Sequence, residues 1–267
     1  MVLYPHLVVD GRALEYRSVV GDAALPTLVL LHEGLGCVAL WRDFPEHLAA
    51  ITGCAIFAYS RFGYGGSASE PTPWPLDYMQ RHGRFTLPAV LDAAGIGPCI
   101  LIGHSDGASI ALVNAGAVRD PRVQGVIALA PHVFTETHGL DSIRAARSAF
   151  TAGDLRPRLA KHHGVNVACA FFGWCDSWLH PDFEFWNIEG YLRGIQVPVM
   201  LIQGGDDQYG TREQLRRIER RVVAPVEIHL LTACQHAPHF EQSAQTLELM
   251  REFVMRNSKP PHFRLPG

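Results

Sequence analysis

Six short apolar runs recur along the chain, each followed by a loop and then by further polar or helical sequence. The runs are TLVLLHEG (27–34), CAIFAYSRFG (54–63), CILIGHS (99–105), GVIALAP (125–131), VPVMLIQGG (197–205) and VEIHLLTAC (226–234). Continuous apolar runs of this length are typical of parallel strands that are buried on both faces. The repeated order of strand and helix therefore predicts an α/β fold with a doubly wound, mostly parallel sheet.

Helical spacing marks several stretches between and after these runs. We expect helices at 86–94, 105–117, 211–222 and 242–254. The third of these carries a cluster of arginines that alternate with apolar residues, which indicates an amphipathic surface helix. Ahead of the first apolar run, an Asp10-Gly11 turn between two alternating segments predicts a β-hairpin.

The interval from residue 132 to residue 194 breaks this order, because it shows helical patterns but no convincing strand. We expect a helical cap at 132–194, inserted into a core made of 1–131 and 195–267. The cap should cover the C-terminal edge of the sheet, where open α/β sheets bind ligands.

Seven aromatic side chains crowd one stretch of this cap. They are Phe171, Phe172, Trp174, Trp178, Phe183, Phe185 and Trp186. Trp174 and Trp178 lie four residues apart and share one face of a helix, so we expect these two to line the substrate pocket. The alternative is that the aromatic residues only hold the cap together.

Composition excludes several classes of protein. Hydrophobic residues make up 48% of the chain, which is enough for a large core, and the net charge of −3 provides no field to attract nucleic acid or an anionic membrane. No apolar run approaches the roughly 20 residues that span a bilayer, and no signal peptide is evident. The six cysteines show no CxxC pairing or metal-ligand spacing. We expect a cytoplasmic protein with no metal site and no cofactor, and the sequence leaves its oligomeric state open.

The stretch GHSDG follows the apolar run CILI and opens the helix expected at 105–117. A serine at a sharp turn from strand to helix needs small neighbours, which Gly103 and Gly107 supply. This context predicts that Ser105 is a nucleophile. A serine hydroxyl also requires a base, and a third group to orient that base.

Candidates for both partners follow later strands. Asp206 and Asp207 come after VPVMLI, and His236 and His239 come after VEIHLL. The resulting chain order, serine, then acid, then histidine, is the order of the α/β hydrolases.

From about residue 28 to residue 253 the chain resembles the α/β-hydrolase superfamily. In relatives the acid usually stands three residues after the glycine that closes its strand, which implies Asp207, with Asp206 as the alternative. In the stretch HAPHFE the resemblance implies that the first histidine, His236, is the base. His239 is then expected to pack in the interior or to cap the last helix.

Two backbone N–H groups are expected to bind the oxyanion that forms during acyl transfer. One belongs to the residue after the nucleophile, Asp106. The resemblance implies that the other belongs to Gly34 in the loop HEGLG, with Leu35 as the alternative. Glu33 replaces a glycine that is usual in relatives, and it either touches the resting nucleophile or anchors the loop.

The sequence leaves open which groups the side chains of Asp106 and Arg61 contact. An acidic side chain in the first turn of a helix is favourable, and we expect the Asp106 carboxylate to turn away from the oxyanion. It either serves helix chemistry alone or takes part in the reaction. Arg61, in a glycine-rich loop that resembles a conserved loop of relatives, either reaches the Glu33 loop or forms an ordinary surface ion pair.

These features predict a serine hydrolase that cleaves the carboxylic ester bond of a small-molecule substrate through an acyl-enzyme, with no nucleic-acid or membrane partner. Alternatives with the same three residues are a thioesterase, a lactonase and a C–C bond hydrolase of aromatic degradation products. A fourth alternative is a non-catalytic ligand receptor on the same fold.

Overall fold

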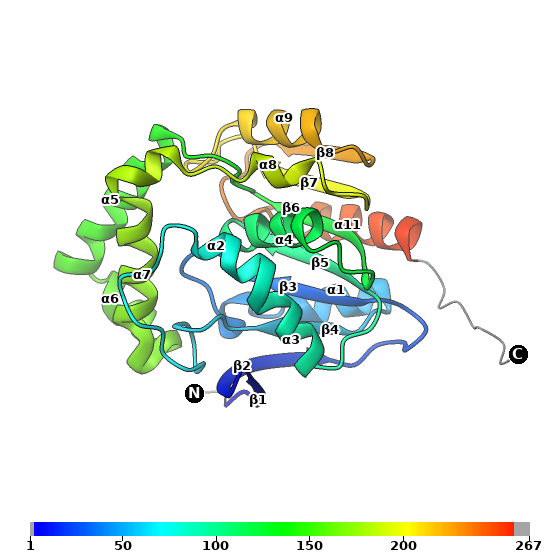
Figure 1. The fold of residues 1–267 in the computed structure, drawn as a ribbon, viewed down its shortest axis with the longest axis horizontal. Coiled ribbons are helices and arrows are strands. Elements are labelled where there is room, and N and C mark those ends of the chain that lie inside the picture. Colours follow the sequence, from blue (N-terminus) through cyan, green and yellow to red (C-terminus); the bar gives the residue numbers. More distant parts are fainter. Residues whose placement is uncertain (1–2, 259–267) are drawn as a thin grey trace, which may run out of the picture.

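The computed structural model describes residues 3–258. One sheet runs through the molecule in the strand order β1-β2-β4-β3-β5-β6-β7-β8 (Figure 1). Its strands are β1 (His6–Val9), β2 (Arg12–Val19), β3 (Thr27–Leu31), β4 (Ile56–Tyr59), β5 (Cys99–His104), β6 (Val123–Leu129), β7 (Val199–Gly204) and β8 (Val226–Leu231). The hairpin β1-β2 is antiparallel and pairs antiparallel with β4, and all remaining neighbours are parallel.

Each of the six apolar runs overlaps one of the strands β3 to β8, and the hairpin turns at Asp10 and Gly11 as expected. Strands β4, β5 and β7 are buried along their whole length, and β3 is buried from its second residue on, because helices cover both faces of the sheet. The predicted α/β fold with a mostly parallel sheet is therefore confirmed.

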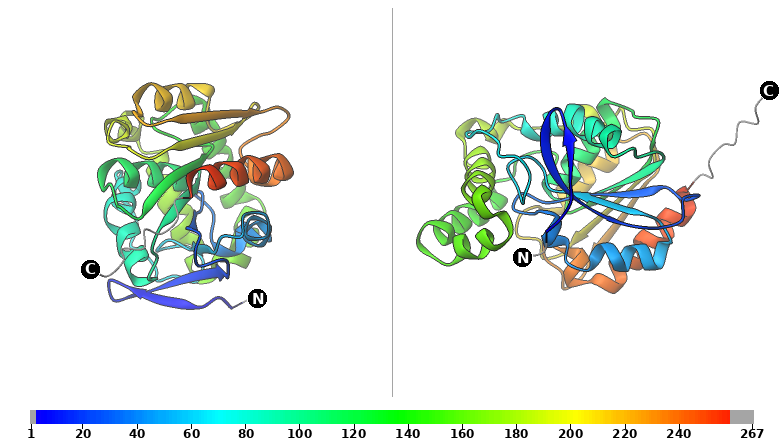
Figure 2. Two further views of the ribbon diagram at one scale, coloured as in Figure 1. Left: turned by 90° about the vertical axis from the view of Figure 1, so that its right-hand side faces the viewer. Right: turned by 90° about the horizontal axis from the view of Figure 1, so that it is seen from below.

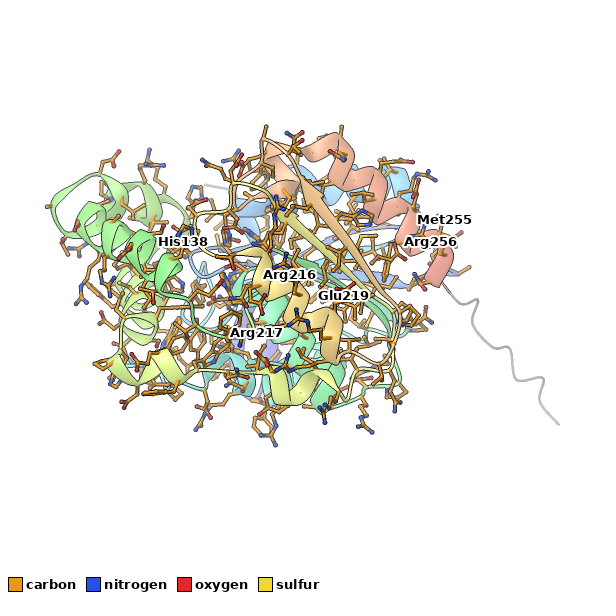
Figure 3. All side chains as sticks on the ribbon, turned by 90° about the horizontal axis from the view of Figure 1, so that it is seen from above. His138, Arg216, Arg217, Glu219, Met255 and Arg256 are labelled. Carbon is orange, nitrogen blue, oxygen red and sulfur yellow. The ribbon has the colours of Figure 1, made fainter. Side chains whose placement is uncertain are left out.

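Helices form a layer on each side of the sheet (Figures 1 and 2). One layer contains α3 (Leu87–Ala93), α4 (Asp106–Ala117) and α9 (Arg212–Arg221), and the other contains α1 (Phe44–Thr52) and α11 (Ser243–Asn257). Alternate residues of each strand enter opposite cores: Leu101 packs toward α4, whereas Ile100 and Ile102 pack toward α11. On the outer surface of α9, Arg216 and Glu219 project into solvent (Figure 3), so this is the amphipathic helix that the sequence indicated.

The helix expected at 86–94 begins earlier than the sequence suggested. Helix α2 (Tyr78–Arg81) continues through a wide π turn (His82–Thr86) directly into α3. Pro88 has no N–H to donate to the preceding turn, and its ring needs space there. A wider turn at this point accommodates both. Gly83 fits here because a Cβ atom would lie 2.7 Å from the carbonyl oxygen of Ile110 in α4.

A helical insertion separates β6 from β7 and lies at one end of the sheet (Figure 1). It contains α5 (Thr137–Ala152), α6 (Leu155–His163), α7 (Val167–Trp178) and shorter helical turns, and it ends near α8 (Glu189–Leu192). Helix α8 packs back on α4 and α9 of the core. We propose that the cap comprises 132–194 and the core 1–131 and 195–267, although 1–2 and 259–267 lie outside the described residues.

Two glycines allow α4 to start directly at the end of β5. A Cβ atom on Gly107 would lie 2.0 Å from the carbonyl oxygen of Leu31, and a Cβ atom on Gly103 would lie 2.3 Å from the carbonyl oxygen of Gly107. Neither contact is possible for a larger residue without a backbone shift. The first turn of α4 is therefore pressed against β3 and β5.

Gly107→Ala should lower the free energy of unfolding by several kcal/mol, since backbone atoms of β3 and α4 must separate to accept the methyl group. At roughly 2–4 °C per kcal/mol for a protein of this size, the melting temperature should fall by about 10 °C. The matched control is Gly97→Ala, because a Cβ atom there has no neighbour within 4 Å. Equal melting temperatures for the two variants would contradict this explanation.

Candidate functional site

Ser105 lies at the turn between β5 and α4 with φ +53° and ψ −117°. A positive φ is uncommon for a residue with a side chain, and the close packing of the flanking glycines holds it there. The carbonyl of Ser105 accepts hydrogen bonds from the N–H groups of Ala108 and Ser109, at 2.9 and 3.1 Å. The serine is thus fixed at the N-terminal end of α4, with its side chain at the wall of a cavity.

Asp207 and His236 face each other from the loops after β7 and β8. Nδ1 of His236 lies 2.8 and 3.0 Å from the two carboxylate oxygens of Asp207. Because an ionised carboxylate cannot donate, this nitrogen carries the proton and leaves Nε2 as the basic atom. Asp206, the alternative from the sequence, is exposed, and no ion pair joins it to a histidine among the described residues.

The carboxylate of Asp207 is also held by its own loop and strand. It accepts hydrogen bonds from the N–H groups of Tyr209 and Gly210, at 2.8 and 3.3 Å, and from the amide of Gln203, at 3.3 Å. Burial acts to raise its pKa, but the charge and hydrogen bond of His236 outweigh burial and lower the pKa to about 2. Asp207 is therefore a charged acceptor over the whole neutral range.

His239 lies in the second helical layer, away from the cavity. Its ring packs against Trp41 and Phe44, with ring centroids 5.2 and 5.4 Å apart, and against His104 at 4.7 Å. Burial lowers its pKa well below the usual value, so it is neutral at pH 7. The packing role that the sequence suggested fits this position.

The loop after β3 passes beside the nucleophile and under the cap. A Cβ atom on Gly34 would lie 2.2 Å from Nε1 of Trp174, so the indole of α7 rests directly on this glycine. No residue of 3–258 accepts a hydrogen bond from the N–H of Gly34 or from that of Asp106. Both groups lie in residues that line the cavity, and both are free to bind a ligand oxygen.

Glu33 lies between this loop and the histidine that precedes the nucleophile. Its carboxylate is 3.5 Å from Nδ1 of His104, and it curls over Gly36, where a Cβ atom would lie 2.4 Å from it. Burial acts to raise the pKa of Glu33, but the neighbouring His104 outweighs it, so the pKa is lowered. These contacts fit an anchoring role for Glu33, which also lines the cavity.

Arg61 is completely buried, at 1% exposure. Its guanidinium donates to the carbonyl oxygens of His32 and Glu33, at 3.1 and 3.0 Å, and lies 3.8 Å from the carboxylate of Asp106. Of the two alternatives from the sequence, the surface ion pair is wrong, because the side chain is in the interior. Arg61 reaches the Glu33 loop.

The side chain of Asp106 turns away from the cavity toward a partner that the sequence did not reveal. The hydroxyl of Tyr78 donates to its Oδ2 at 2.5 Å, and Nε1 of Trp178 donates to that hydroxyl at 3.0 Å. Burial raises the pKa of Asp106 above its usual value, while Arg61 and Tyr78 act to lower it. Because Arg61 keeps its charge at every accessible pH, the ionised carboxylate is the form that balances it.

The cavity has a volume of about 110 Å³ and lies between the strand ends and the cap. Its wall combines the predicted residues with others that the sequence analysis missed. The candidates from the sequence that line it are Glu33, Gly34, Leu35, Ser105, Asp106, Trp174, Trp178 and His236, and the missed ones are His132, Gly139, Ile143 and Tyr209. His132 directly follows the apolar run 125–131, so its place at a strand end was a usable signal.

Metal sites, disulfides and membrane-spanning helices were considered only for the part of the chain that the structure describes. Within 3–258, no group of three or more histidine, cysteine or acidic side chains is arranged to hold a metal ion. The six cysteines, which all lie in this range, are free thiols. No helix in the described range is both long and apolar enough to cross a membrane.

The sequence matches a known family, whose fold is the one described above. A family model described as alpha/beta hydrolase fold covers residues 26–187, which is more than half of the chain. The chain belongs to this family, and we describe it as an α/β hydrolase. It is also 28% identical over 102 residues to the sn-1-specific diacylglycerol lipase of Mus musculus, a match that covers 38% of this chain and about a third (32%) of that relative.

Solved structures of the same fold include enzymes with several reactions. The enol-lactonase from Burkholderia xenovorans superposes with a TM-score of 0.72 at 18% identity, covering 94% of this chain and 100% of that one. A serine hydrolase involved in carbazole degradation gives 0.74 at 14% identity, covering 95% and 99%. An esterase from Rhodococcus sp. gives 0.71 at 19% identity, covering 95% and 99%. At these identities the likeness establishes the fold alone.

His239→Phe should make the protein less sensitive to acid. The neutral buried ring takes up a proton only on unfolding, so the unfolded state binds more protons below about pH 6.5 and stability falls as the pH falls. Phenylalanine fits the aromatic surroundings and removes this proton. The loss of unfolding free energy between pH 7 and pH 5, measured by urea titration, should shrink by on the order of 1 kcal/mol.

The control for this experiment is His47→Gln, since His47 is more than half exposed and should leave the pH dependence unchanged. An unchanged acid sensitivity in His239→Phe would show that this ring is already charged, or hydrated, in the folded protein.

Proposed function

We propose that this α/β hydrolase is a serine hydrolase that cleaves carboxylic esters. The observation that carries the proposal is the convergence of Ser105 and His236 on one cavity, with His236 held by the buried carboxylate of Asp207 at 2.8 Å. A neutral imidazole oriented in this way is the base that a serine nucleophile requires.

In the proposed reaction, Oγ of Ser105 attacks the ester carbonyl carbon while its proton passes to Nε2 of His236. The carbonyl oxygen becomes an oxyanion and is bound by the N–H groups of Gly34 and Asp106. Collapse of this intermediate breaks the bond to the alcohol, which leaves with the proton from His236. Water then attacks the acyl-enzyme by the same route, His236 returns a proton to Ser105, and a carboxylic acid is released.

The lining of the cavity supports a neutral substrate. No lysine or arginine lies among its lining residues, and the carboxylate of Glu33 gives it negative character. An anionic acyl group would be repelled, which disfavours ring-cleavage products that carry a carboxylate. A neutral lactone remains the second candidate, because an intramolecular ester needs the same chemistry and a lactonase shares this fold.

The nucleophile and the acid can be tested together. Ser105→Ala should abolish turnover of p-nitrophenyl acetate and labelling by a fluorophosphonate, with the fold intact by circular dichroism. Asp207→Asn should lower kcat by about 10³- to 10⁴-fold, because the amide stabilises the wrong imidazole tautomer. The exposed neighbour supplies the matched control, so Asp206→Asn should keep the wild-type rate.

Three results would contradict the proposal. A wild-type protein that neither hydrolyses esters nor reacts with the probe would favour the non-catalytic ligand receptor. Residual acyl-enzyme in Ser105→Ala, seen by mass spectrometry, would identify another nucleophile. A larger loss in Asp206→Asn than in Asp207→Asn would reverse the assignment of the acid.

We further propose that Trp174 and Trp178 form an aromatic wall that selects the substrate. Trp178 also packs against Phe183, with ring centroids 4.8 Å apart, and its Nε1 donates to Tyr78, so a change there would also disturb the contact with Asp106. Burial of an aryl group against this wall is worth about 25 cal/mol per Å². Trp174→Ala should reduce kcat/KM for phenyl acetate by at least tenfold more than for methyl acetate.

The control for the aromatic wall is Phe185→Ala, because Phe185 belongs to the same cap but is 77% exposed. Its selectivity should equal that of the wild type. An equal loss of kcat/KM for both esters in Trp174→Ala, together with a lower melting temperature, would assign Trp174 to the cap core.

A further inference from the structure

The chain places a fully buried arginine behind the loop that carries the N–H of Gly34. We infer that Arg61, neutralised by the side chain of Asp106, is a positioning residue that holds this N–H in the direction of the oxyanion. The inference rests on the proposed function, since it concerns the donors of that reaction.

The peptide that joins Glu33 to Gly34 sets the direction of the Gly34 N–H. A peptide unit is planar and trans, so its C=O and N–H point in opposite directions. The carbonyl of Glu33 accepts from the Arg61 guanidinium at 3.0 Å, from Nδ1 of His32 at 2.7 Å and from the N–H of Gly36 at 3.1 Å. Fixing this carbonyl therefore fixes the direction of the Gly34 N–H.

Arg61 controls the other donors to this carbonyl as well. Its backbone N–H donates to Nε2 of His32 at 3.0 Å, which leaves the proton of that ring on Nδ1, where it serves Glu33. Its second guanidinium nitrogen donates to the carbonyl of His32 at 3.1 Å. A forked guanidinium can bind two successive carbonyls at once, which a lysine ammonium cannot do with the same geometry.

Planarity of the peptide unit also fixes the direction of the second proposed donor, the N–H of Asp106. The carbonyl of Ser105 accepts hydrogen bonds inside α4, so the N–H of Asp106 points out of the N-terminal end of the helix. The side chain of Asp106 meanwhile lies 3.8 Å from the Arg61 guanidinium. Asp106 would thus supply one oxyanion donor through its backbone N–H. Its carboxylate would stabilise Arg61, which positions the other donor, the N–H of Gly34.

This arrangement also explains why a charged pair is retained in the interior. Removing one member leaves an uncompensated buried charge, which is strongly destabilising. Arg61→Met alone could therefore unfold the protein. The double variant Arg61→Met/Asp106→Asn removes both charges, keeps the backbone N–H of residue 106 and retains a side chain that can bind Tyr78, so it is the main test.

The experiment measures kcat and KM for p-nitrophenyl acetate and the inhibition constant of a trifluoromethyl ketone, whose serine adduct carries an oxyanion. In the double variant kcat should fall ten- to a hundredfold with KM changed less than threefold, because a misplaced donor weakens the transition state most. Ketone affinity should fall in proportion to kcat/KM. Arg61→Lys keeps the positive charge but lacks the forked guanidinium, so its kcat should stay at least tenfold below that of the wild type.

The matched control is Arg17→Met, since Arg17 also donates to a backbone carbonyl, that of Arg42 at 2.5 Å, and pairs with Glu46 far from the cavity. It should keep wild-type kinetics. Wild-type kcat and ketone affinity in the double variant, full activity in Arg61→Lys, or an equal loss in Arg17→Met would each overturn the inference.

Amide hydrogen exchange provides a readout that does not depend on activity. A peptide covering residues 32–36 should exchange at least tenfold faster in the double variant than in the wild type and in Arg17→Met. A wild type that has no esterase activity and does not bind the ketone would overturn the proposed function, while this exchange would still test the anchoring. Unchanged exchange in the double variant would overturn the anchoring itself.

Discussion

The contact between the first turn of α4 and the end of β3 is the constraint on which the site depends. It exists because Gly107 has no side chain, so that the helix backbone approaches Leu31 to a distance that a Cβ atom would forbid. Ser105 is held at a positive φ by this packing, and the loop after β3 is brought beside it. The proposed nucleophile and the proposed oxyanion donors are therefore placed by one backbone contact.

Buried charged side chains near the site lower the stability of the fold. Arg61 and Asp106 lie in the interior, where an unpaired charge is strongly unfavourable. Each is compensated by carbonyl oxygens, a hydroxyl or a neighbouring ionisable group. Such an arrangement costs stability compared with apolar packing but leaves the loop few alternative conformations, which suits groups that must be oriented before the substrate arrives.

The cap and the core are joined by polar contacts as well as by packing. Trp178 of α7 donates to Tyr78, which donates to Asp106 at the start of α4. His163 of α6 accepts from the N–H of Gly65 at 3.1 Å, and its other nitrogen lies 3.1 Å from the carbonyl of Leu35. Movement of the cap would consequently disturb the loop that carries Leu35, which borders the cavity, and the loop that carries Gly65. The wall of the pocket is thus coupled to the proposed reaction centre.

The sequence by itself determined the fold class and the chain order of the candidate residues. Apolar runs revealed the parallel strands, and Ser105, Asp207 and His236 were recognisable because each follows such a run. The helix that begins at Tyr78 was missed at its start, because Gly83 and the π turn hide its periodicity.

Only the tertiary structure decided which partner each side chain meets. It brought Asp207 rather than Asp206 to His236, buried Arg61 behind Glu33 and gave Asp106 the hydroxyl of Tyr78. These contacts join residues far apart in the chain, and they follow from how helices and loops pack in three dimensions. Local sequence patterns report periodicity and burial, but they carry no direct information on such long-range pairs.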